Sequence, residues 1–567
     1  MTIVNKKKIA ELLKTKIDYF TIEQIEDLIE IPPTEFPFTH AFPCFRLSKF
    51  EKKKPDLLAS ELRSKIVLPE YLAEIQSKGA YLNFRVKPEL VLLTIMKMEE
   101  EYGKLETKSI TSRTIVIEYP SPNTNKPLHL GHIRNILLGS TMSNIYKYIG
   151  HKIFQVNLNN DRGIHICKSM LWYKKWGKNK EPNQKSDHFV GQAYVNYHTE
   201  LEKNESLAQE AKDILLSWEN NDPNTRALWK KMSKWALEGF KETYEKFSVT
   251  FDKEYFESDF YWKGKDKITE ALEKGIFEKD DDGAIIARLK DKYDLPDKVL
   301  LRSDGTTIYV TQDIYLAYLK KEDFHYDTSI YVVGNEQDLY FKQLFAILDA
   351  IGFKEEMYHF SYGMISLPGG KMKSREGRTV DADDLVDEMF DLAYGEVSNR
   401  YTDLSEEEKR YRANVIGKAA LRFFILKFDP KSDFMFNPNE SIKFKGETGP
   451  YIQYCYARIQ SIIFKSKETI TSSINYEILS HEKELLLIKL LHQFPGEVYQ
   501  AATTHGIHLI PQYLLSLCQA FNSFYNDCVV ISDDKEVEKA RLLLIRCVQI
   551  IIKSGLNLLG IETLDEM

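Results

Sequence analysis

Two histidines three residues apart form the most chemically informative feature of the sequence. His129 and His132 flank Gly131 in the string H-L-G-H, where a predicted strand gives way to a predicted helix. Side chains three residues apart on a helix face the same way. The backbone N–H groups and dipole of a helix N-terminus favour an anion such as a triphosphate, and glycine allows a nucleotide to approach closely. The string therefore predicts a nucleotide site, whereas zinc lacks a third ligand in register.

A basic loop between glycines is the second candidate. Residues 369–377 read G-G-K-M-K-S-R-E-G, which places Lys371, Lys373, Ser374 and Arg375 together. Three cations and a hydroxyl suit a reacting triphosphate, although on its own such a loop is more typical of a solvated basic turn. The other common phosphate-binding strings, G-x-x-x-x-G-K-[ST] and G-x-G-x-x-G, are absent from the sequence.

A strand, a helix and a second strand are predicted around the histidine pair. Residues 115–119 are a short apolar β-rich run, the apolar residues of 133–149 fall at helical spacing, and 152–158 is again strand-like. Such a βαβ unit predicts a parallel sheet with its site at the carboxyl ends of the strands. Further strands are expected at 308–310 and 330–333.

Three domains are predicted along the chain. Residues 1–110 are expected to form a small α+β domain with a strand at 79–86. Residues 111–400 carry the parallel sheet, interrupted from about residue 169 to 251 by a polar helical insertion. Residues 401–567 show long amphipathic patterns typical of an all-helical bundle.

The last helix of that bundle is expected over residues 536–554. Asp533 and Glu536 resemble a capping box at its start, and Gly555 is expected to end it.

Size and composition indicate a soluble globular protein. The 567 residues are too many for one ordinary core, and no apolar run approaches the ~20 residues that span a bilayer. The N-terminus lacks the features of a secretory signal. The six cysteines form no C-x-x-C pair, so reduced thiols in the cytoplasm are expected. A net charge of −7 argues only weakly against a nucleic-acid partner.

The motifs and the strings around them resemble class I aminoacyl-tRNA synthetases, and the arginyl-tRNA synthetase family in particular. H-L-G-H and K-M-K-S-R are similar to the two class I signature motifs. The similarity to the arginine family extends, in that family's order, over nearly the whole chain: EYPSPN at 118–123, YVTQDI at 309–314, YVVGNEQD at 331–338 and GETGPY at 446–451.

This resemblance implies a multidomain α/β fold. A Rossmann-like parallel-sheet catalytic domain would follow an N-terminal α+β domain that contacts the tRNA elbow, and an all-α anticodon-binding bundle would come last. The implied activity is that of an arginine–tRNA ligase, which activates arginine with ATP and transfers it to the 3′-terminal ribose of its tRNA. The first step is expected to need tRNA. The implied partners are arginine, ATP with Mg²⁺ on its phosphates, and tRNA. We expect the protein to be a cytoplasmic monomer that contacts no membrane and has no metal-binding side chains.

The resemblance also assigns site residues. It places arginine against Ser121, Pro122, Asn123, His132, Tyr309, Asp313 and Gln337. It places ATP against His129, Gly131, His132, Lys371 and Ser374, and it makes His129, His132, Lys371, Lys373 and Arg375 catalytic. A guanidinium favours a rigidly held carboxylate, for which Asp313 is the natural candidate, although an acid there is equally typical of a helix N-terminus.

The basic loop departs from the usual class I string K-M-S-K-S, because its second lysine is displaced by one position. Which of Lys373 and Arg375 contacts the phosphates therefore stays open.

Three alternatives remain. The chain could be a different H-x-G-H nucleotidyltransferase that adenylylates a small metabolite, although such enzymes are usually much shorter. It could be a catalytically silent RNA-binding or scaffold relative. A silent copy would have no reason to keep five intact residues: His129, Gly131, His132, Lys371 and Asp313. It could also activate another amino acid, and ATP–pyrophosphate exchange with a panel of amino acids separates this from arginine activation.

Overall fold

Two compact units divide the chain. The computed structural model describes residues 4–33, 35–178, 180–368 and 380–567. One unit combines Met1–Ile110 with Lys443–Met567, and the other is the continuous stretch Thr111–Ile442. Every residue assigned to the candidate site lies in the second unit.

A parallel sheet forms the centre of the second unit. Its described strands lie in the order β11-β10-β4-β5-β6, and each pairs in parallel with its neighbour. Within this sheet β4 comes first in the sequence and lies between β5 and β10. The later strands are therefore added on both sides of it. Parallel sheets bind ligands at the carboxyl end of such a switch point. The strands are β4 (Thr114–Glu118), β5 (Lys152–Asn159), β6 (Lys253–Phe256), β10 (Thr328–Gly334) and β11 (Glu356–Tyr362).

The predicted βαβ unit around the histidine pair is confirmed. Strand β4 leads through a turn into helix α6 (Leu130–Tyr148), and β5 follows. The apolar residues of β4 are buried because helices cover both faces of the sheet, as a continuous apolar run in a parallel strand predicts. Gly139 of α6 lies directly against the ring of Tyr119, where an added Cβ would come within 2.5 Å of Cγ.

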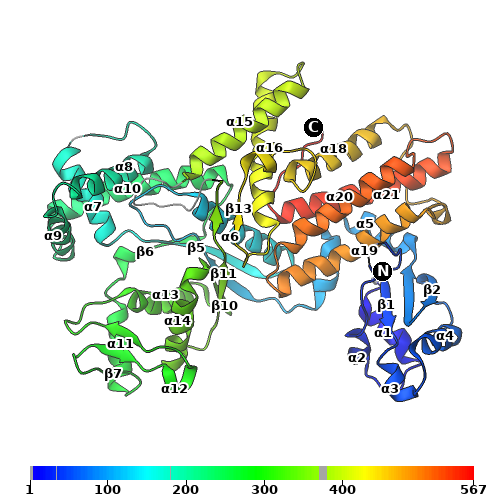
Figure 1. Ribbon diagram of the computed structural model, residues 1–567, viewed down its shortest axis with the longest axis horizontal. Coiled ribbons are helices and arrows are strands. Elements are labelled where there is room, and N and C mark those ends of the chain that lie inside the picture. The colour runs from blue at the N-terminus through cyan, green and yellow to red at the C-terminus, as the bar shows by residue number, and fades with distance from the viewer. Residues whose placement is uncertain (1–3, 34, 179, 369–379) are drawn as a thin grey trace. The chain divides into compact units, whose positions relative to one another are not determined.

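Four helices occupy the predicted insertion between β5 and β6. Figure 1 shows them gathered in one lobe on the β5–β6 side of the sheet. Tyr173, Phe189 and Trp235 pack edge to face within the lobe, inside a core whose other members are mainly aliphatic. The helices are α7 (Ile164–Trp176), α8 (Ser186–Leu201), α9 (Leu207–Glu219) and α10 (Pro223–Lys246).

The strand predicted at 308–310 is wrong, because helix α13 (Tyr309–Phe324) begins there. A three-residue apolar run does not distinguish the two structures. The burial of Val310, Ile314 and Ala317 follows the helical period instead, and Thr311 accepts a hydrogen bond from the backbone N–H of Ile308. The strand predicted at 330–333 is confirmed as part of β10.

The remaining elements complete the second unit. A small sheet of β7 (Glu278–Lys279), β8 (Ile285–Ala287) and β9 (Lys298–Leu301) lies with α11 (Gly264–Glu273) and α12 (Lys290–Tyr293) between β6 and α13. After α13 come α14 (Asp338–Ala350), β12 (Ile365–Ser366), α15 (Ala382–Arg400), α16 (Glu406–Leu426), β13 (Phe434–Met435) and α17 (Pro438–Ser441).

The N-terminal part of the first unit is the expected mixture of helices and strands. Its sheet has the antiparallel order β1-β3-β2, and β3 (Tyr81–Val86) lies within the strand predicted at 79–86. Proline in the first turn begins α4 and α5, where its missing N–H has no helical partner to lose. The other elements are α1 (Lys6–Lys14), α2 (Ile22–Glu26), β1 (His40–Pro43), α3 (Leu47–Glu51), α4 (Pro55–Lys65), β2 (Leu72–Lys78) and α5 (Pro88–Met98).

Long helices form the C-terminal part of the same unit. They are α18 (Gly449–Lys465), α19 (Glu482–Thr503), α20 (Leu509–Asp527) and α21 (Lys535–Leu558). Lys489 of α19 joins them to the N-terminal part, since its ammonium group donates to the carbonyls of Pro32, Pro33 and Phe36.

The predicted ends of the last helix need correction. Asp534, not Asp533, caps α21 by accepting hydrogen bonds from the backbone N–H groups of Glu536 and Val537. Gly555 does not end the helix, which continues to Leu558. Its small size serves packing instead, because a Cβ there would lie 2.7 Å from a methyl carbon of Leu514 in α20.

All six cysteines of the chain are buried free thiols, as predicted. Among the helices that the structure describes, none has the length and apolarity required to cross a bilayer.

Candidate active site

The histidine pair forms the N-terminal cap of α6. His129 Nδ1 accepts a hydrogen bond of 3.1 Å from the backbone N–H of Gly131, and His132 Nδ1 accepts one of 3.1 Å from the backbone N–H of His129. The ring centroids lie 4.0 Å apart. Because both Nδ1 atoms are acceptors, the proton of each neutral ring is on Nε2.

The environment keeps both imidazoles neutral. Burial and the nearby Lys126 ammonium group lower the pKa of His129 to about 4. Burial also lowers the pKa of His132 well below its ordinary value, and the neighbouring His129 and Lys126 lower it further. At neutral pH the pair therefore offers two Nε2–H donors at a helix N-terminus, a set that suits phosphate oxygens and gives no lone pair to a metal.

The space beside Gly131 is occupied by the ring of His129. A Cβ at this position would lie 3.0 Å from Cε1 of the His129 ring, so a side chain would disturb the ring. The close approach of a nucleotide to Gly131 stays a prediction.

A short backbone pairing fixes the segment before α6. The N–H of Leu130 donates to the carbonyl of Val380, and the N–H of Ala382 donates to the carbonyl of Leu128. These bonds hold the residues that follow the basic loop against His129. Lys371, Lys373, Ser374 and Arg375 themselves lie outside the described residues.

The turn after β4 carries Ser121, Pro122 and Asn123. Its backbone is held on β5 and the residues after it: the Ser121 N–H donates to Asn157 Oδ1 at 3.2 Å, and Asn160 donates from its side chain to the Ser121 carbonyl and from its backbone to the Pro122 carbonyl. Asn123 remains exposed. The turn therefore presents its groups at the carboxyl edge of the sheet.

Asp313 lies in the second turn of α13, partly exposed, and its carboxylate accepts a hydrogen bond from the Tyr340 hydroxyl. Helix α13 runs antiparallel to β10, which follows it, so its N-terminal turns face the carboxyl edge of the sheet. Burial raises the pKa of Asp313 to about 7; Tyr340 and Lys320 lower it, and Glu118 raises it. A bound guanidinium is the kind of charge that would return this carboxyl to its ionised form.

A buried ion pair between Lys320 and Glu118 lies near Asp313. The fully buried Lys320 ammonium donates to Glu118 at 2.8 Å and to Ser329 at 3.1 Å, and it lies 3.8 Å from the centre of the Tyr331 ring. Ser121 Oγ lies 3.5 Å from the other oxygen of Glu118. The pair links the turn after β4 to helix α13.

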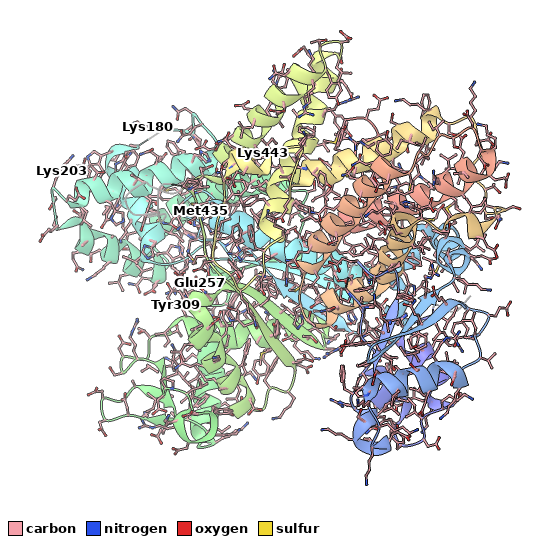
Figure 2. All side chains as sticks on the ribbon, turned by 45° about the vertical axis from the view of Figure 1, so that its right-hand side comes forward. Lys180, Lys203, Glu257, Tyr309, Met435 and Lys443 are labelled. Atoms are coloured by element: carbon pink, nitrogen blue, oxygen red, sulfur yellow. The ribbon has the colours of Figure 1, made fainter. Side chains whose placement is uncertain are left out.

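Tyr309 and Gln337 complete the predicted arginine pocket. Tyr309 is 70% exposed at the start of α13, and Gln337 is exposed in a 3-10 turn (Asn335–Gln337) directly after β10. Partial burial of the phenol and the nearby Glu257 carboxylate raise the pKa of Tyr309; Figure 2 labels Tyr309 and Glu257. The turn after β4, the turn after β10 and the start of α13 thus lie at one edge of the sheet.

Sequence reasoning assigned no role to four polar residues of this region. Lys126 influences the histidine pair, Tyr340 binds Asp313, and the buried Lys320 pairs with Glu118. The fourth is Glu257, whose pKa burial raises to about 7 and which lies 3.5 Å from Arg162. Only Lys320 left a signal, a lysine three residues after Ala317 on the apolar face of α13.

The fold and the histidine cap define a class I aminoacyl-tRNA synthetase. The family model described as "tRNA synthetases class I (R), catalytic domain" matches residues 94–438. Models described as "Arginyl tRNA synthetase N terminal domain" and "DALR anticodon binding domain" match 5–86 and 452–567.

Whole-chain relatives narrow the class to one family. The chain is 43% identical to an arginine–tRNA ligase of Treponema denticola over 96% of this chain and 95% of the relative. It is 40% identical to that of Bacteroides thetaiotaomicron over 100% of both. The solved arginyl-tRNA synthetase of Thermus thermophilus matches with a TM-score of 0.83 and 25% identity over 99% of both chains. The chain belongs to the arginyl-tRNA synthetase family.

Proposed function

We propose that the chain is an arginine–tRNA ligase whose active site is the carboxyl edge of the β4–β10 sheet. The carboxylate of arginine attacks the α-phosphorus of ATP, pyrophosphate leaves, and arginyl-adenylate forms. A ribose hydroxyl at the 3′ end of tRNA then attacks the arginyl carbonyl and AMP leaves. The observation that carries the proposal is the Asp313 carboxylate, fixed by Tyr340 and backed by the Glu118–Lys320 pair.

Arginine binds with its guanidinium toward Asp313. Hydrogen bonding between a guanidinium and a fixed carboxylate is strong and directional. Tyr309 and Gln337 form the exposed walls of this pocket. Ser121, Pro122, Asn123 and His132 contact the remainder of the amino acid, at the turn that leads from β4 to α6.

ATP binds at the N-terminus of α6. The Nε2–H groups of His129 and His132 donate to phosphate oxygens, and Gly131 lies between the two histidines at the same site. Lys371, Lys373, Ser374 and Arg375 supply further charge and hydrogen bonding to the phosphates. Mg²⁺ is carried by the triphosphate itself, since the Nε2–H groups of the two imidazoles are donors and do not bind a metal.

The three proposed domains divide the work. Residues 111–400 carry catalysis, residues 1–110 contact the tRNA elbow, and residues 401–567 read the anticodon. The protein acts as a monomer in the cytoplasm, and the first step waits for tRNA.

An exposed aromatic and basic surface supports the anticodon-reading role. Arg458 stacks 4.6 Å from the Tyr454 ring and 5.4 Å from the Tyr525 ring, and Phe464 nearby is 86% exposed. Unstacked RNA bases bind such aromatic and guanidinium faces. Tyr456, by contrast, is buried in the bundle core, as helical spacing predicts for most aromatic residues.

Charging assays with arginine and citrulline test the proposal. Citrulline has the shape of arginine but a neutral side chain, so a carboxylate pocket discriminates strongly between them. We expect charging of tRNA with arginine and none above background with citrulline, lysine or methionine. Equal charging with citrulline would contradict a role for the Asp313 charge, and charging only with another amino acid would contradict the proposed specificity.

A further inference from the structure

A cluster of paired charges joins helix α8 of the insertion to the start of α15. Lys185, directly before α8, donates to Asp383 at 2.6 Å, to Thr243 at 2.6 Å and to Asp187 at 3.1 Å. Lys246 lies 2.8 Å from the other oxygen of Asp383. Asp187 is fully buried and Asp383 is 7% exposed, so the charges hold one another in a largely dry site.

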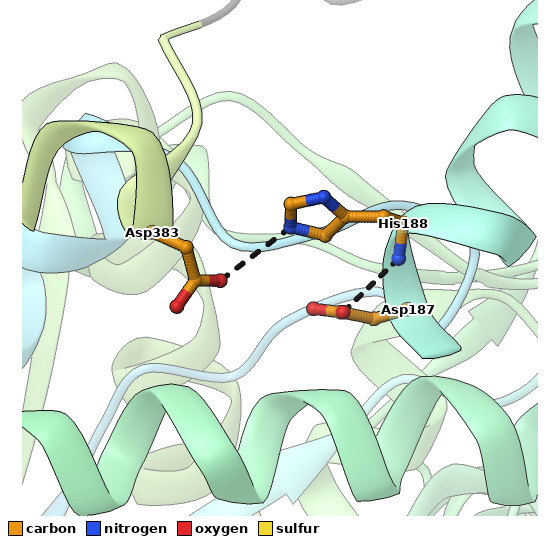
Figure 3. A group of neighbouring side chains, drawn as sticks. All are labelled: Asp187, His188 and Asp383. Carbon is orange, nitrogen blue, oxygen red and sulfur yellow. Dashed lines mark hydrogen bonds and ion pairs between the residues drawn. The ribbon is translucent and has the colours of Figure 1, made fainter. Parts of the chain in front are cut away.

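His188 of α8 completes the cluster. Its Nε2 lies 3.2 Å from Asp381 and 3.5 Å from Asp383, while Asp187 accepts a hydrogen bond from its backbone N–H. Figure 3 shows the ring pointing toward Asp383, while Asp187 is joined to the backbone nitrogen of His188. Hydrogen bonding to Asp381 and Asp383 raises the pKa of His188 to about 10, so the ring is a cation at neutral pH.

The spacing of Asp187, His188 and Asp383 would also suit a metal ion. The lysines argue against one, because Lys185 and Lys246 already neutralise the two oxygens of Asp383. A protonated His188 has no lone pair to offer either. The cluster is therefore a set of ion pairs that joins two segments.

The segment held in this way leads directly to the histidine cap. Asp381 caps α15 by accepting hydrogen bonds from the N–H groups of Asp383 and Asp384. The flanking residues Val380 and Ala382 exchange backbone hydrogen bonds with Leu130 and Leu128. A shift of this corner would move the backbone on both sides of His129.

Helix α8 also touches the turn before His129 directly. A Cβ at Gly191 would lie 2.4 Å from Cδ of Pro127, so the turn packs on the bare backbone of α8. The first two turns of α8 thus contact two segments, the 380–383 corner and the turn that ends in the histidine pair.

We infer that Lys185 and His188 are positioning residues for the ATP end of the active site. They hold the corner formed by Asp381 and Asp383, and that corner sets the backbone position of His129. The inference rests on the proposed function, since it assumes that the histidine pair binds ATP. It gives the insertion a part in adenylate formation without any contact between α8 and the substrates.

Kinetics of ATP–pyrophosphate exchange, with saturating tRNA present, test the inference. The variants are Lys185→Met and His188→Gln, with Lys185→Arg and His188→Lys as charge-preserving partners. The control is Lys175→Met, which breaks the exposed 2.7 Å pair with Glu210 in the same lobe. We expect kcat/KM for ATP to fall about tenfold or more in the first two variants, through KM for ATP, because small displacements of a catalytic group are costly. KM for arginine stays within about twofold of the wild-type value.

The charge-preserving variants should recover most of the lost ATP affinity, and Lys175→Met should match the wild type. His188 is 25% exposed, so His188→Gln is the variant that keeps the test valid if Lys185→Met does not fold, as checked by circular dichroism. A lowered kcat with both KM values unchanged, or an equal rise of both, would overturn the inference. A wild-type protein without arginine-dependent exchange would instead contradict the proposed function.

Discussion

Asp313 and His129 lie on helices whose N-terminal turns face the same edge of one sheet, and burial shifts both toward the neutral form. The consequences differ between the ATP end of the site, at His129, and the arginine end, at Asp313. A neutral imidazole with its proton on Nε2 is ready to donate to a phosphate oxygen, so burial prepares the ATP end. A neutral carboxyl is a poor partner for a guanidinium, so burial opposes the arginine end until the ligand supplies its charge. The arginine end should therefore depend on pH and on hydrogen-bond donors to Asp313, whereas the ATP end should not.

The largest expected effect comes from removing the charge of Asp313. Asp313→Asn leaves a cationic substrate without its carboxylate, which costs about 2–5 kcal/mol. We expect kcat/KM for arginine to fall by a factor of roughly 30 to several thousand, while KM for ATP changes little. Asp323→Asn is the matched control, because this residue lies in the last turn of the same helix and pairs with Lys253 and Tyr255. An equal fall of kcat/KM for arginine in both variants would show that the loss comes from a destabilised helix and not from the missing charge of Asp313.

At the ATP end, His129→Asn preserves the helix cap, because asparagine is a good N-cap residue. It removes the Nε2–H donor. Loss of one such donor to a developing charge costs about 100-fold in kcat, and we expect this loss in pyrophosphate exchange with KM for arginine unchanged. An unchanged kcat would exclude His129 from contact with the reacting phosphates.

The pH dependence should separate the two ends. With a pKa of about 7, Asp313 is ionised above neutral pH and protonated below it. Arginine binding therefore weakens as the pH falls through 7, and we expect KM for arginine to rise about tenfold between pH 8 and pH 6. KM for ATP should show no break from His129, whose pKa of about 4 lies below this window.

Protein stability gives an independent readout of the same titration. A carboxyl whose pKa is raised on folding contributes stability at low pH, which is lost as the pH rises through 7. Bound arginine opposes that loss. The increase in melting temperature caused by arginine should therefore be larger at pH 8 than at pH 6, and a pH-independent increase would contradict the assignment of Asp313.

Among the three site substitutions, the smallest effect is expected from Tyr340→Phe. This change removes one hydrogen bond to Asp313, worth about 1.5 kcal/mol at the lower end of the range for a charged partner, so KM for arginine should rise roughly tenfold. Because the Tyr340 hydroxyl lowers the pKa of Asp313, the break in KM for arginine should also move to higher pH. An unchanged pH profile would show that Tyr340 does not act through this carboxyl.

Local sequence patterns predicted much of the fold and the position of the histidine pair. The three-residue spacing in H-L-G-H was enough to place two imidazoles together at the start of α6, because helix geometry fixes that relation. The apolar run 115–119 and the period of 133–149 predicted β4 and α6 for the same reason. The short run 308–310 failed because three residues are fewer than one helical turn.

The partners of the site residues were out of reach of such patterns. Tyr340 reaches Asp313 from another helix, Lys320 reaches Glu118 across 202 positions, and Lys185 reaches Asp383 across 198. Each contact depends on the order of strands in the sheet, which no local spacing encodes. The pKa values follow from these contacts and from burial, so they too required the structure.

The most direct test of the central claim is ATP–pyrophosphate exchange driven by arginine, measured with and without its tRNA on the folded wild-type protein. The account predicts exchange with arginine when tRNA is present and none when tRNA is absent. Exchange without tRNA would contradict the proposed order of steps. No exchange with arginine under either condition would contradict the activity itself.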